Sequence, residues 1–227
     1  MSVQALAVRE SFSRVGRGPI RLVSSAPETG LFDLMGAPST FARNEEVYGE
    51  GEPAEYLYMV TSGCVRTSKI LNDGRRQIGA FYLPGDVFGL EAGDEHTFSA
   101  EALAPTTVRI VKRVALTSRA ACDSAMASQL FNLTVAELQR TQSRVLLLIK
   151  SAQERVAGFL LEMANRAKSA SEIDLPMCRQ DIADYLGLTI ETVSRTLTQL
   201  ENAAAIALPT SRRIVLRNRP ALARMNS

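Results

Sequence analysis

Cysteine and histidine are scarce in this 227-residue chain, and long apolar runs are absent. The three cysteines, Cys64, Cys122 and Cys178, lie far apart, so they form neither a disulfide framework nor the close spacing of a zinc or iron–sulfur site. His96 is the only histidine. A metal-dependent enzyme usually needs several converging His or carboxylate ligands, so we expect no metal site and interpret His96 as a surface residue. There is also no nucleophile–base pair and no phosphate-cradling loop, so an enzyme is the least favoured class.

No apolar stretch reaches the ~20 residues of a transmembrane helix, and the N-terminus lacks the apolar core of a signal peptide. We therefore expect a cytoplasmic protein with no membrane partner. The net charge of +2 is only a weak indication of nucleic acid, but the charges are unevenly distributed. Residues 30–115 carry 12 acidic and 8 basic side chains, whereas residues 150–227 carry 11 basic and 8 acidic ones. A basic C-terminal part is what contact with phosphates requires.

Residues 175–201 read LPMCRQDIADYLGLTIETVSRTLTQLE and predict two short helices joined by a tight turn. Gly187 stands where a helix ends with a left-handed backbone, and the Thr189 hydroxyl can cap the next helix. The first helix, residues 178–185, has apolar residues on one face: Ile182, Ala183 and Leu186. The second, about residues 190–200, has a predicted buried stripe of Ile190, Val193, Leu197 and Leu200.

The outward face of the second helix carries chemistry that can read bases. Recognition helices contact base edges with their N-terminal residues. A glutamate such as Glu191 accepts from cytosine N4, and an arginine such as Arg195 bonds O6 and N7 of guanine together. We therefore predict a helix-turn-helix that binds double-stranded DNA, with base contacts from Glu191, Ser194 and Arg195. An αα-hairpin with a merely solvated outer face is the alternative that the pattern alone leaves open.

The block Glu191-Thr192-Val193-Ser194-Arg195 is similar to the E-x-x-S-R pattern of Fnr-type members of the Crp/Fnr superfamily of transcription regulators. The Crp branch has an additional Arg directly before this Glu, where the chain has Ile190. The resemblance extends over nearly the whole chain from about Leu31. It implies a TTGA-type half-site, a homodimer and RNA polymerase as protein partner. Arg179 matches a phosphate-contacting position of the family, and we expect further phosphate contacts from Thr189 and Thr192.

Residues 31–110 contain short runs punctuated by Gly, Pro and Asp, which predict many short strands in a closed roll or sandwich. Among these signals, Asn72-Asp73-Gly74 is typical of a hairpin turn. The ordered series G-E, L-Y, G, D-G, P-G-D and F-G resembles the cyclic-nucleotide-binding β-roll of the superfamily.

The predicted roll lacks the residues that would hold a cyclic nucleotide. In the cAMP-binding branch an Arg-Ser pair holds the phosphate. Residues 92–99 here read AGDEHTFS, with no Arg before Ser99 and with Asp94 and Glu95 as repelling charges. We expect no cyclic nucleotide. A regulator gated by another small molecule in the roll and a regulatory subunit that presents the roll to a protein stay as alternatives.

Residues 1–30 have no clear period, and we expect a flexible tail, with a targeting or nucleic-acid-binding arm as the alternative. Oxygen-sensing Fnr proteins carry a cysteine cluster in this region. The tail contains no cysteine, so we expect no iron–sulfur cluster held in that way and no other cofactor.

Residues 126–151 contain no Pro or Gly and predict a long helix. Its side chains repeat at alternating spacings of four and three, as in the seam of a coiled coil. In the superfamily this helix is the dimer axis; the alternative is a helix that packs only on its own roll. The predicted dimer interface is Phe131, Val135, Leu138, Gln142, Val145 and Ile149. A second helix is expected at residues 152–167, followed by a polar link at residues 168–174.

Residues 205–208 and 214–216 predict a β-hairpin wing with Arg212 and Arg213 near its tip. We expect both arginines to contact phosphates; a solvated basic turn is the alternative.

Cys178 stands at the start of the first helix of the helix-turn-helix. A helix N-terminus and the adjacent Arg179 favour the reactive thiolate, so we predict that Cys178 is redox-sensitive. Oxidation would place a negative charge near DNA phosphates. The plainer interpretation is a small substitute for Ser or Thr. Cys64 and Cys122 are expected to be structural.

The resulting prediction is an α+β chain with four parts. They are a tail (1–30), a β-roll (31–115), a dimerisation helix (116–150) and a winged helix-turn-helix domain (151–227). Fnr-like base contacts without a cysteine cluster or a cAMP Arg-Ser pair resemble the FixK group of the superfamily. This resemblance implies a regulator, most often an activator, of genes for microaerobic respiration and nitrogen fixation.

Overall fold

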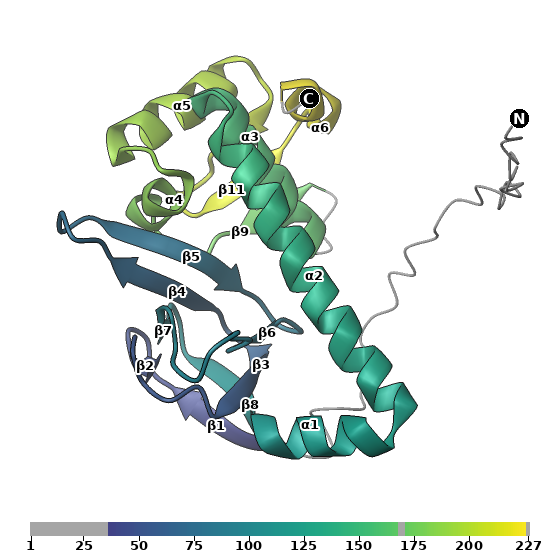
Figure 1. Cartoon of the computed structure of the whole chain (residues 1–227). Coiled ribbons are helices and arrows are strands. Elements are labelled where there is room, and N and C mark those ends of the chain that lie inside the picture. The colour runs from purple at the N-terminus through teal and green to yellow at the C-terminus, as the bar shows by residue number, and fades with distance from the viewer. Residues whose placement is uncertain (1–35, 168–170, 226–227) are drawn as a thin grey trace, which may run out of the picture.

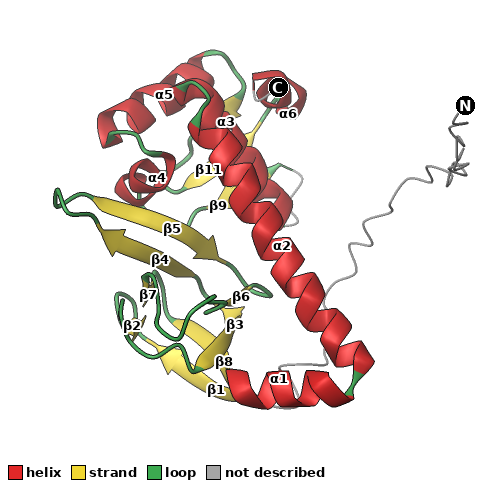
Figure 2. Ribbon diagram, viewed as in Figure 1, coloured by secondary structure: helices red, strands yellow, loops and turns green. Residues whose placement is uncertain are grey.

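The computed structural model describes residues 36–167 and 171–225, so the predicted tail at residues 1–30 lies outside the described residues. A β-roll is followed by a long helix, α2, which runs past the roll to a group of helices and short strands near the C-terminus (Figures 1 and 2). This α+β architecture is the predicted one.

The roll consists of two four-stranded antiparallel sheets, in the orders β1-β8-β3-β6 and β2-β7-β4-β5. The predicted hairpin turn is confirmed: Gly74 has φ +83°, which favours glycine, and the turn joins β4 to β5. The strands are β1 (Ala37–Phe41), β2 (Glu46–Tyr48), β3 (Tyr56–Ser62), β4 (Val65–Ile70), β5 (Arg76–Tyr82), β6 (Val87–Phe88), β7 (Ser99–Ala102) and β8 (Thr106–Lys112).

The region predicted as one dimerisation helix, residues 116–150, contains a break. Helix α1 (Arg113–Cys122) ends before Asp123, and α2 (Ser124–Leu148) begins after it. Asp123 is extended and its carboxylate accepts from the N–H groups of Ala125 (2.9 Å) and Met126 (3.2 Å), which caps α2. The sequence pattern did not reveal this cap, because apolar periodicity continues on both sides of it.

Helix α3 (Ala152–Arg166) begins with a capping box formed by Ser151 and Glu154. The remaining elements are β9 (Glu172–Asp174), α4 (Arg179–Leu186), α5 (Ile190–Asn202), β10 (Ile206–Ala207), β11 (Arg213–Leu216) and α6 (Arg219–Met225). The predicted wing hairpin is confirmed by the pairing of β10 with β11. The interpretation of residues 168–174 as a link is wrong at its end, since β9 pairs with β11, and α6 was not predicted.

One hydrophobic core runs from the roll into the C-terminal part. Phe81 of β5 lies 5.1 Å from Tyr185 of α4 and 6.3 Å from Phe159 of α3, measured between ring centroids. All three side chains are buried, together with Ile78 of β5 and Ile182 of α4. Helices α3 and α4 are therefore packed directly on β5.

Across residues 36–167 and 171–225, no helix combines the length and the apolar character needed to cross a bilayer. The same residues contain no group of three or more His, Cys, Asp or Glu side chains placed to hold a metal ion.

Candidate nucleic-acid interface

Helices α4 and α5 form the predicted helix-turn-helix. Gly187 ends α4 with a left-handed backbone (φ 63°, ψ 41°), where a side chain would be strained. Thr189 caps α5: its hydroxyl accepts from the Thr192 N–H at 3.2 Å and lies 3.1 Å from the Thr192 hydroxyl. The turn and the cap together fix the angle at which α5 leaves α4, as the sequence predicts.

Three of the four predicted stripe residues of α5 are buried, namely Val193, Leu197 and Leu200. The prediction for Ile190 is wrong, because 37% of it is exposed. Ile190 is the first residue of α5, and the N-terminal turn of this helix extends beyond the core formed with α4. Apolar spacing alone could not reveal this, since position 190 continues the same repeat.

The exposed N-terminal end of α5 carries the candidate base-reading side chains. Glu191 and Arg195 are exposed, and Ser194 is half-buried between them. Hydrogen bonds from the Glu191 backbone N–H and from Thr189 lower the pKa of the Glu191 carboxyl, which keeps it an acceptor at neutral pH. Ile190 adds an apolar group to this surface, which was missed at the sequence level.

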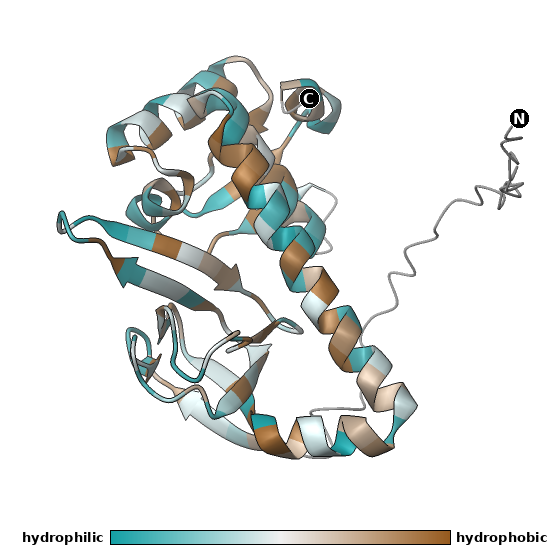
Figure 3. Cartoon of the chain, in the orientation of Figure 1, coloured by the Kyte–Doolittle hydropathy of each residue, from teal (hydrophilic) through white to brown (hydrophobic). Residues whose placement is uncertain are grey.

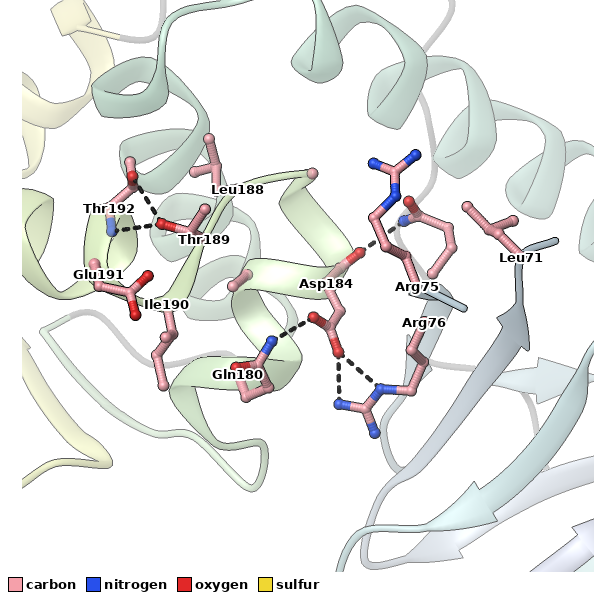
Figure 4. Close-up of a pocket in the computed structure, with 13 residues that line it drawn as sticks. Leu71, Arg75, Arg76, Gln180, Asp184, Leu188, Thr189, Ile190, Glu191 and Thr192 are labelled. Atoms are coloured by element: carbon pink, nitrogen blue, oxygen red, sulfur yellow. Dashed lines mark hydrogen bonds and ion pairs between the residues drawn. The ribbon is translucent and has the colours of Figure 1, made fainter. Parts of the chain in front are cut away.

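A cleft of about 740 Å³ separates this surface from the tip of the β4–β5 hairpin. Leu71 and Arg75 line the hairpin side, and Thr189, Ile190 and Glu191 line the other side (Figure 4). The N-terminal end of α5 is therefore separated from the roll by this cleft.

The predicted phosphate contacts have different surroundings. Thr189 is exposed and Thr192 is half-buried. Arg179 is half-buried, and its Nη1 donates to Ser194 Oγ at 3.2 Å. This guanidinium therefore contacts one of the candidate base-reading side chains.

The two wing arginines differ from each other. Arg213 is exposed but forms an ion pair with Glu172 of β9, which compensates part of its charge. Arg212 is half-buried, and its backbone N–H donates to the Thr210 hydroxyl at 3.3 Å. Arg212 is thus the wing arginine whose guanidinium has no ion-pair partner among the described residues.

Cys178 is exposed at the N-cap of α4. Its backbone N–H and its thiol both lie near Asp181 Oδ2, at 3.0 Å and 3.1 Å. The nearest charged neighbour of the sulfur is therefore a carboxylate, whereas the sequence argument relied on the cation of Arg179. Cys64 is fully buried, and burial raises the pKa of its thiol to about 12. Cys122, expected to be structural, is exposed.

Hydrophobic and hydrophilic segments alternate along the ribbon of α2 in Figure 3. On the outer face of this helix and at its C-cap, large apolar side chains are exposed over 55% to 80% of their area. These are Phe131, Leu138, Val145, Leu146 and Ile149. In the rest of the predicted seam, Gln142 is exposed and Val135 is half-buried. On the other face, Leu130 and Leu133 pack against the roll. The predicted seam thus faces mainly away from the protomer's own roll.

Aromatic side chains pack against one another inside the roll. Tyr58 lies 5.2 Å from Tyr48 and 5.0 Å from Phe88 between ring centroids. His96 stacks on Tyr48 at 3.5 Å and is only 2% exposed, so its interpretation as a surface residue is wrong. The Glu91 carboxylate accepts from the Thr97 hydroxyl at 2.9 Å, which closes the loop between β6 and β7.

Two family models match the chain. The Crp-like helix-turn-helix domain matches residues 154–225, and the cyclic nucleotide-binding domain matches residues 38–120.

Known proteins are similar over most of the chain. The nitrogen fixation regulation protein FixK of Azorhizobium caulinodans is 50% identical over 222 residues, covering 95% of this chain and 89% of that protein. FixK of Rhizobium meliloti is 41% identical over 78% of this chain and 81% of that protein. The solved structure of FixK2 from Bradyrhizobium japonicum has a TM-score of 0.81 at 50% identity, covering 85% of this chain and 98% of that one.

Proposed function

Because this chain belongs to the Crp/Fnr family of DNA-binding transcription regulators and to its FixK-like group, we propose that it binds a TTGA-type palindrome as a homodimer, without an effector. The single observation that carries the proposal is the exposed N-terminal end of α5, where Ile190, Glu191 and Arg195 project beyond the core.

The chemistry of these side chains supports the half-site. Arg195 pairs with O6 and N7 of the guanine in TTGA, and Glu191 accepts from N4 of the opposite cytosine. The exposed Ile190 suits the methyl group of a thymine. Phosphate contacts from Thr189, Thr192, Arg179 and the wing arginines position the helix without reading sequence.

A homodimer through α2 supports palindrome binding. The apolar side chains on the outer face of α2 have no cover within the described protomer, and a second copy of the same helix buries them in a coiled coil. A two-fold axis along α2 places two recognition helices about 34–36 Å apart, one turn of DNA. The burial of these apolar side chains from both copies of α2 is the main stabilisation that we assign to the dimer.

The aromatic packing inside the roll supports activity without a cyclic nucleotide. The centre of the roll contains the rings of Tyr48, Tyr58, Phe88 and His96. The Glu91 carboxylate is engaged as well, because it accepts a hydrogen bond from the Thr97 hydroxyl. Phe98 and Ser99 stand where the cAMP-binding branch has its Arg-Ser pair, so the arginine of that pair is missing here.

The relatives supply the biological setting of the proposal. Two of them are named nitrogen fixation regulation proteins, and we propose that this chain activates genes for nitrogen fixation and microaerobic respiration through RNA polymerase. We also propose that peroxide lowers DNA binding through Cys178. The sulfur is exposed, and an oxidised, negatively charged form would lie beside Asp181 and near the DNA-facing side of α4.

The testing experiment measures binding of the reduced protein, with no ligand added, to a labelled duplex with TTGA and TCAA half-sites. A duplex of the same composition in scrambled order, at the same salt concentration, is the control, because phosphate contacts give a salt-dependent background. Selective binding by roughly a thousandfold supports the proposal. Equal binding to both duplexes contradicts it, and selectivity restored by an added small molecule indicates a ligand-gated roll.

A further inference from the structure

The carboxylate of Asp181, in the first turn of α4, joins the helix-turn-helix to the roll. Asp181 is 3% exposed. Its Oδ1 accepts from Arg66 Nη1 of β4 at 2.6 Å and from Arg76 Nη2 of β5 at 2.8 Å. We refer to Arg66, Arg76 and Asp181 as the Asp181 cluster. One carboxylate oxygen of α4 is therefore bound by arginines from two strands of the roll.

Further contacts fix each member of the Asp181 cluster. Arg66 also pairs with Glu101 of β7 at 2.8 Å, and Arg76 pairs with Asp184 of α4 at 2.7 Å. Gln77 of β5 donates to the backbone carbonyl of Asp184 at 2.7 Å. Figure 4 shows the pairing of Arg76 with Asp184 between the hairpin and α4. The other carboxylate oxygen of Asp181 accepts from the Cys178 N–H, which ties the cluster to the start of α4.

The geometry of these contacts restricts the orientation of α4. Guanidinium groups present donors in a planar fork, so a pair of them on one carboxylate tolerates little rotation. Removing one partner of a buried ion pair also strongly destabilises the fold, because water cannot fully replace the lost contact. Behind the cluster, the rings of Phe81 and Tyr185 pack at 5.1 Å. Polar and apolar contacts thus fix α4 on β5, and the capped turn fixes α5 on α4.

We propose that Arg66 and Arg76 are positioning residues for DNA recognition: by binding Asp181 they set the orientation of the helix-turn-helix on the roll, and with it the half-site spacing that the dimer accepts. This inference rests on the proposed dimeric binding of a palindrome. The roll performs by its own side chains the orienting role that a bound effector would otherwise have to perform. Both arginines are bound by carboxylates of α4 and of the roll, so we expect base discrimination not to depend on them.

The test distinguishes an effect on the preferred half-site spacing from an effect on base discrimination. Duplexes carry TTGA and TCAA with half-site centres about 10 base pairs apart, and then with spacers one or two base pairs longer or shorter. The proteins are the full-length chain, the double variant Arg66→Gln/Arg76→Gln and the control Arg75→Gln. Arg75 lies one residue away at the hairpin tip, is largely exposed and pairs with Asp73 rather than with α4.

The unchanged chain and Arg75→Gln are expected to prefer one spacing by roughly tenfold or more over its neighbours. In the double variant this preference falls to within about threefold, while discrimination against a half-site with one changed base stays as in the unchanged chain. In the single variant Arg76→Gln, which keeps the Arg66–Asp181 pair, the spacing preference should fall by less. This variant replaces the double variant in the test if the double variant does not fold. A spacing preference equal to that of the control overturns the proposal.

A measurement without DNA distinguishes the failure of this inference from failure of the proposed function. Amide hydrogen exchange of the free protein should become faster in α4 and β5 in the double variant and stay unchanged in Arg75→Gln. Unchanged exchange in all proteins overturns the positioning role. If the unchanged chain does not select TTGA, the proposed half-site is wrong, and the same spacing series is run on the half-site recovered from a random DNA pool.

Discussion

Arg179 Nη1 donates to Ser194 Oγ at 3.2 Å, so a cation at the start of α4 contacts the hydroxyl of a candidate base-reading residue on α5. A serine hydroxyl has one proton and two lone pairs. With one lone pair occupied by the guanidinium, the Ser194 hydroxyl still has a proton to donate, and we expect a DNA base to accept it. We therefore expect Arg179 to affect base reading as well as phosphate binding.

Arg179→Met is expected to weaken binding to all duplexes and also to reduce discrimination at the base that Ser194 contacts. A double-mutant cycle with Ser194→Ala should give a coupling of about 0.5–1.5 kcal/mol, the range of a single hydrogen bond. Affinities for half-sites with single-base changes supply the measurement. If Arg179 were only a phosphate contact, the two effects would add and all sequences would weaken equally.

Arg195→Ala and Glu191→Ala should each cost about 1–3 kcal/mol of binding to the TTGA duplex and relax the preference at one base pair. The reason is that each removes a directed contact to a base edge. Binding to scrambled DNA should fall little for Arg195→Ala and rise for Glu191→Ala, which removes a negative charge. Fluorescence anisotropy at fixed salt measures both. A uniform loss over all sequences argues against base contact.

Leu138→Glu combined with Val145→Glu should produce monomers, because two charges would be buried in the seam of the dimer. The change is made on the exposed face of α2, so the fold of the protomer should be retained. Light scattering gives the mass, and circular dichroism checks the helix content. Gln139→Glu, an exposed position beside the seam, is the matched control and should stay dimeric. An intact dimer of the double variant would show that the seam lies elsewhere.

The stability of the roll should fall on acidification through His96. Burial lowers the pKa of His96 below its usual value of 6.5, although the neighbouring Glu91 opposes this shift. The unfolded chain therefore takes up the proton first as the pH falls below about 6.5, and stability decreases from there toward the folded-state pKa. His96→Phe keeps the stacking on Tyr48 and should show a smaller drop in melting temperature between pH 7.5 and 5.5. Parallel pH profiles of both proteins would refute this.

Peroxide is expected to weaken DNA binding of the unchanged chain, whereas Cys178→Ser should resist it. Cys122→Ser is the matched control, since Cys122 is also exposed but lies at the end of α1. It should remain as sensitive as the unchanged chain. Mass spectrometry of the treated protein identifies the oxidised residue. Equal loss of binding in Cys178→Ser removes Cys178 from the explanation.

Local signals in the sequence predict most of the fold. Gly187, Thr189 and the Asn72-Asp73-Gly74 turn each have a local backbone reason to occupy their positions, and the structure places them as expected. The failures concern tertiary context. Ile190 has helical spacing but lies beyond the core, and His96 stands in an acidic stretch yet stacks inside the roll.

Contacts between segments that are distant along the chain could not be predicted from the sequence either. The pairing of Arg66 and Arg76 with Asp181 spans 115 and 105 positions, and no local pattern reports it. For the same reason, the sequence does not reveal that Arg213, which we predict to contact phosphate, also pairs with Glu172 of the neighbouring strand.

The continuous core that joins Phe81 of β5 to Phe159 and Tyr185 has a consequence for engineering. A chimera made by exchanging everything after α2 would replace Phe159 and Tyr185 and leave Phe81 facing a foreign surface. The two halves are thus not interchangeable modules. A functional hybrid of this chain needs a crossover that transfers β5 together with the helices that pack on it.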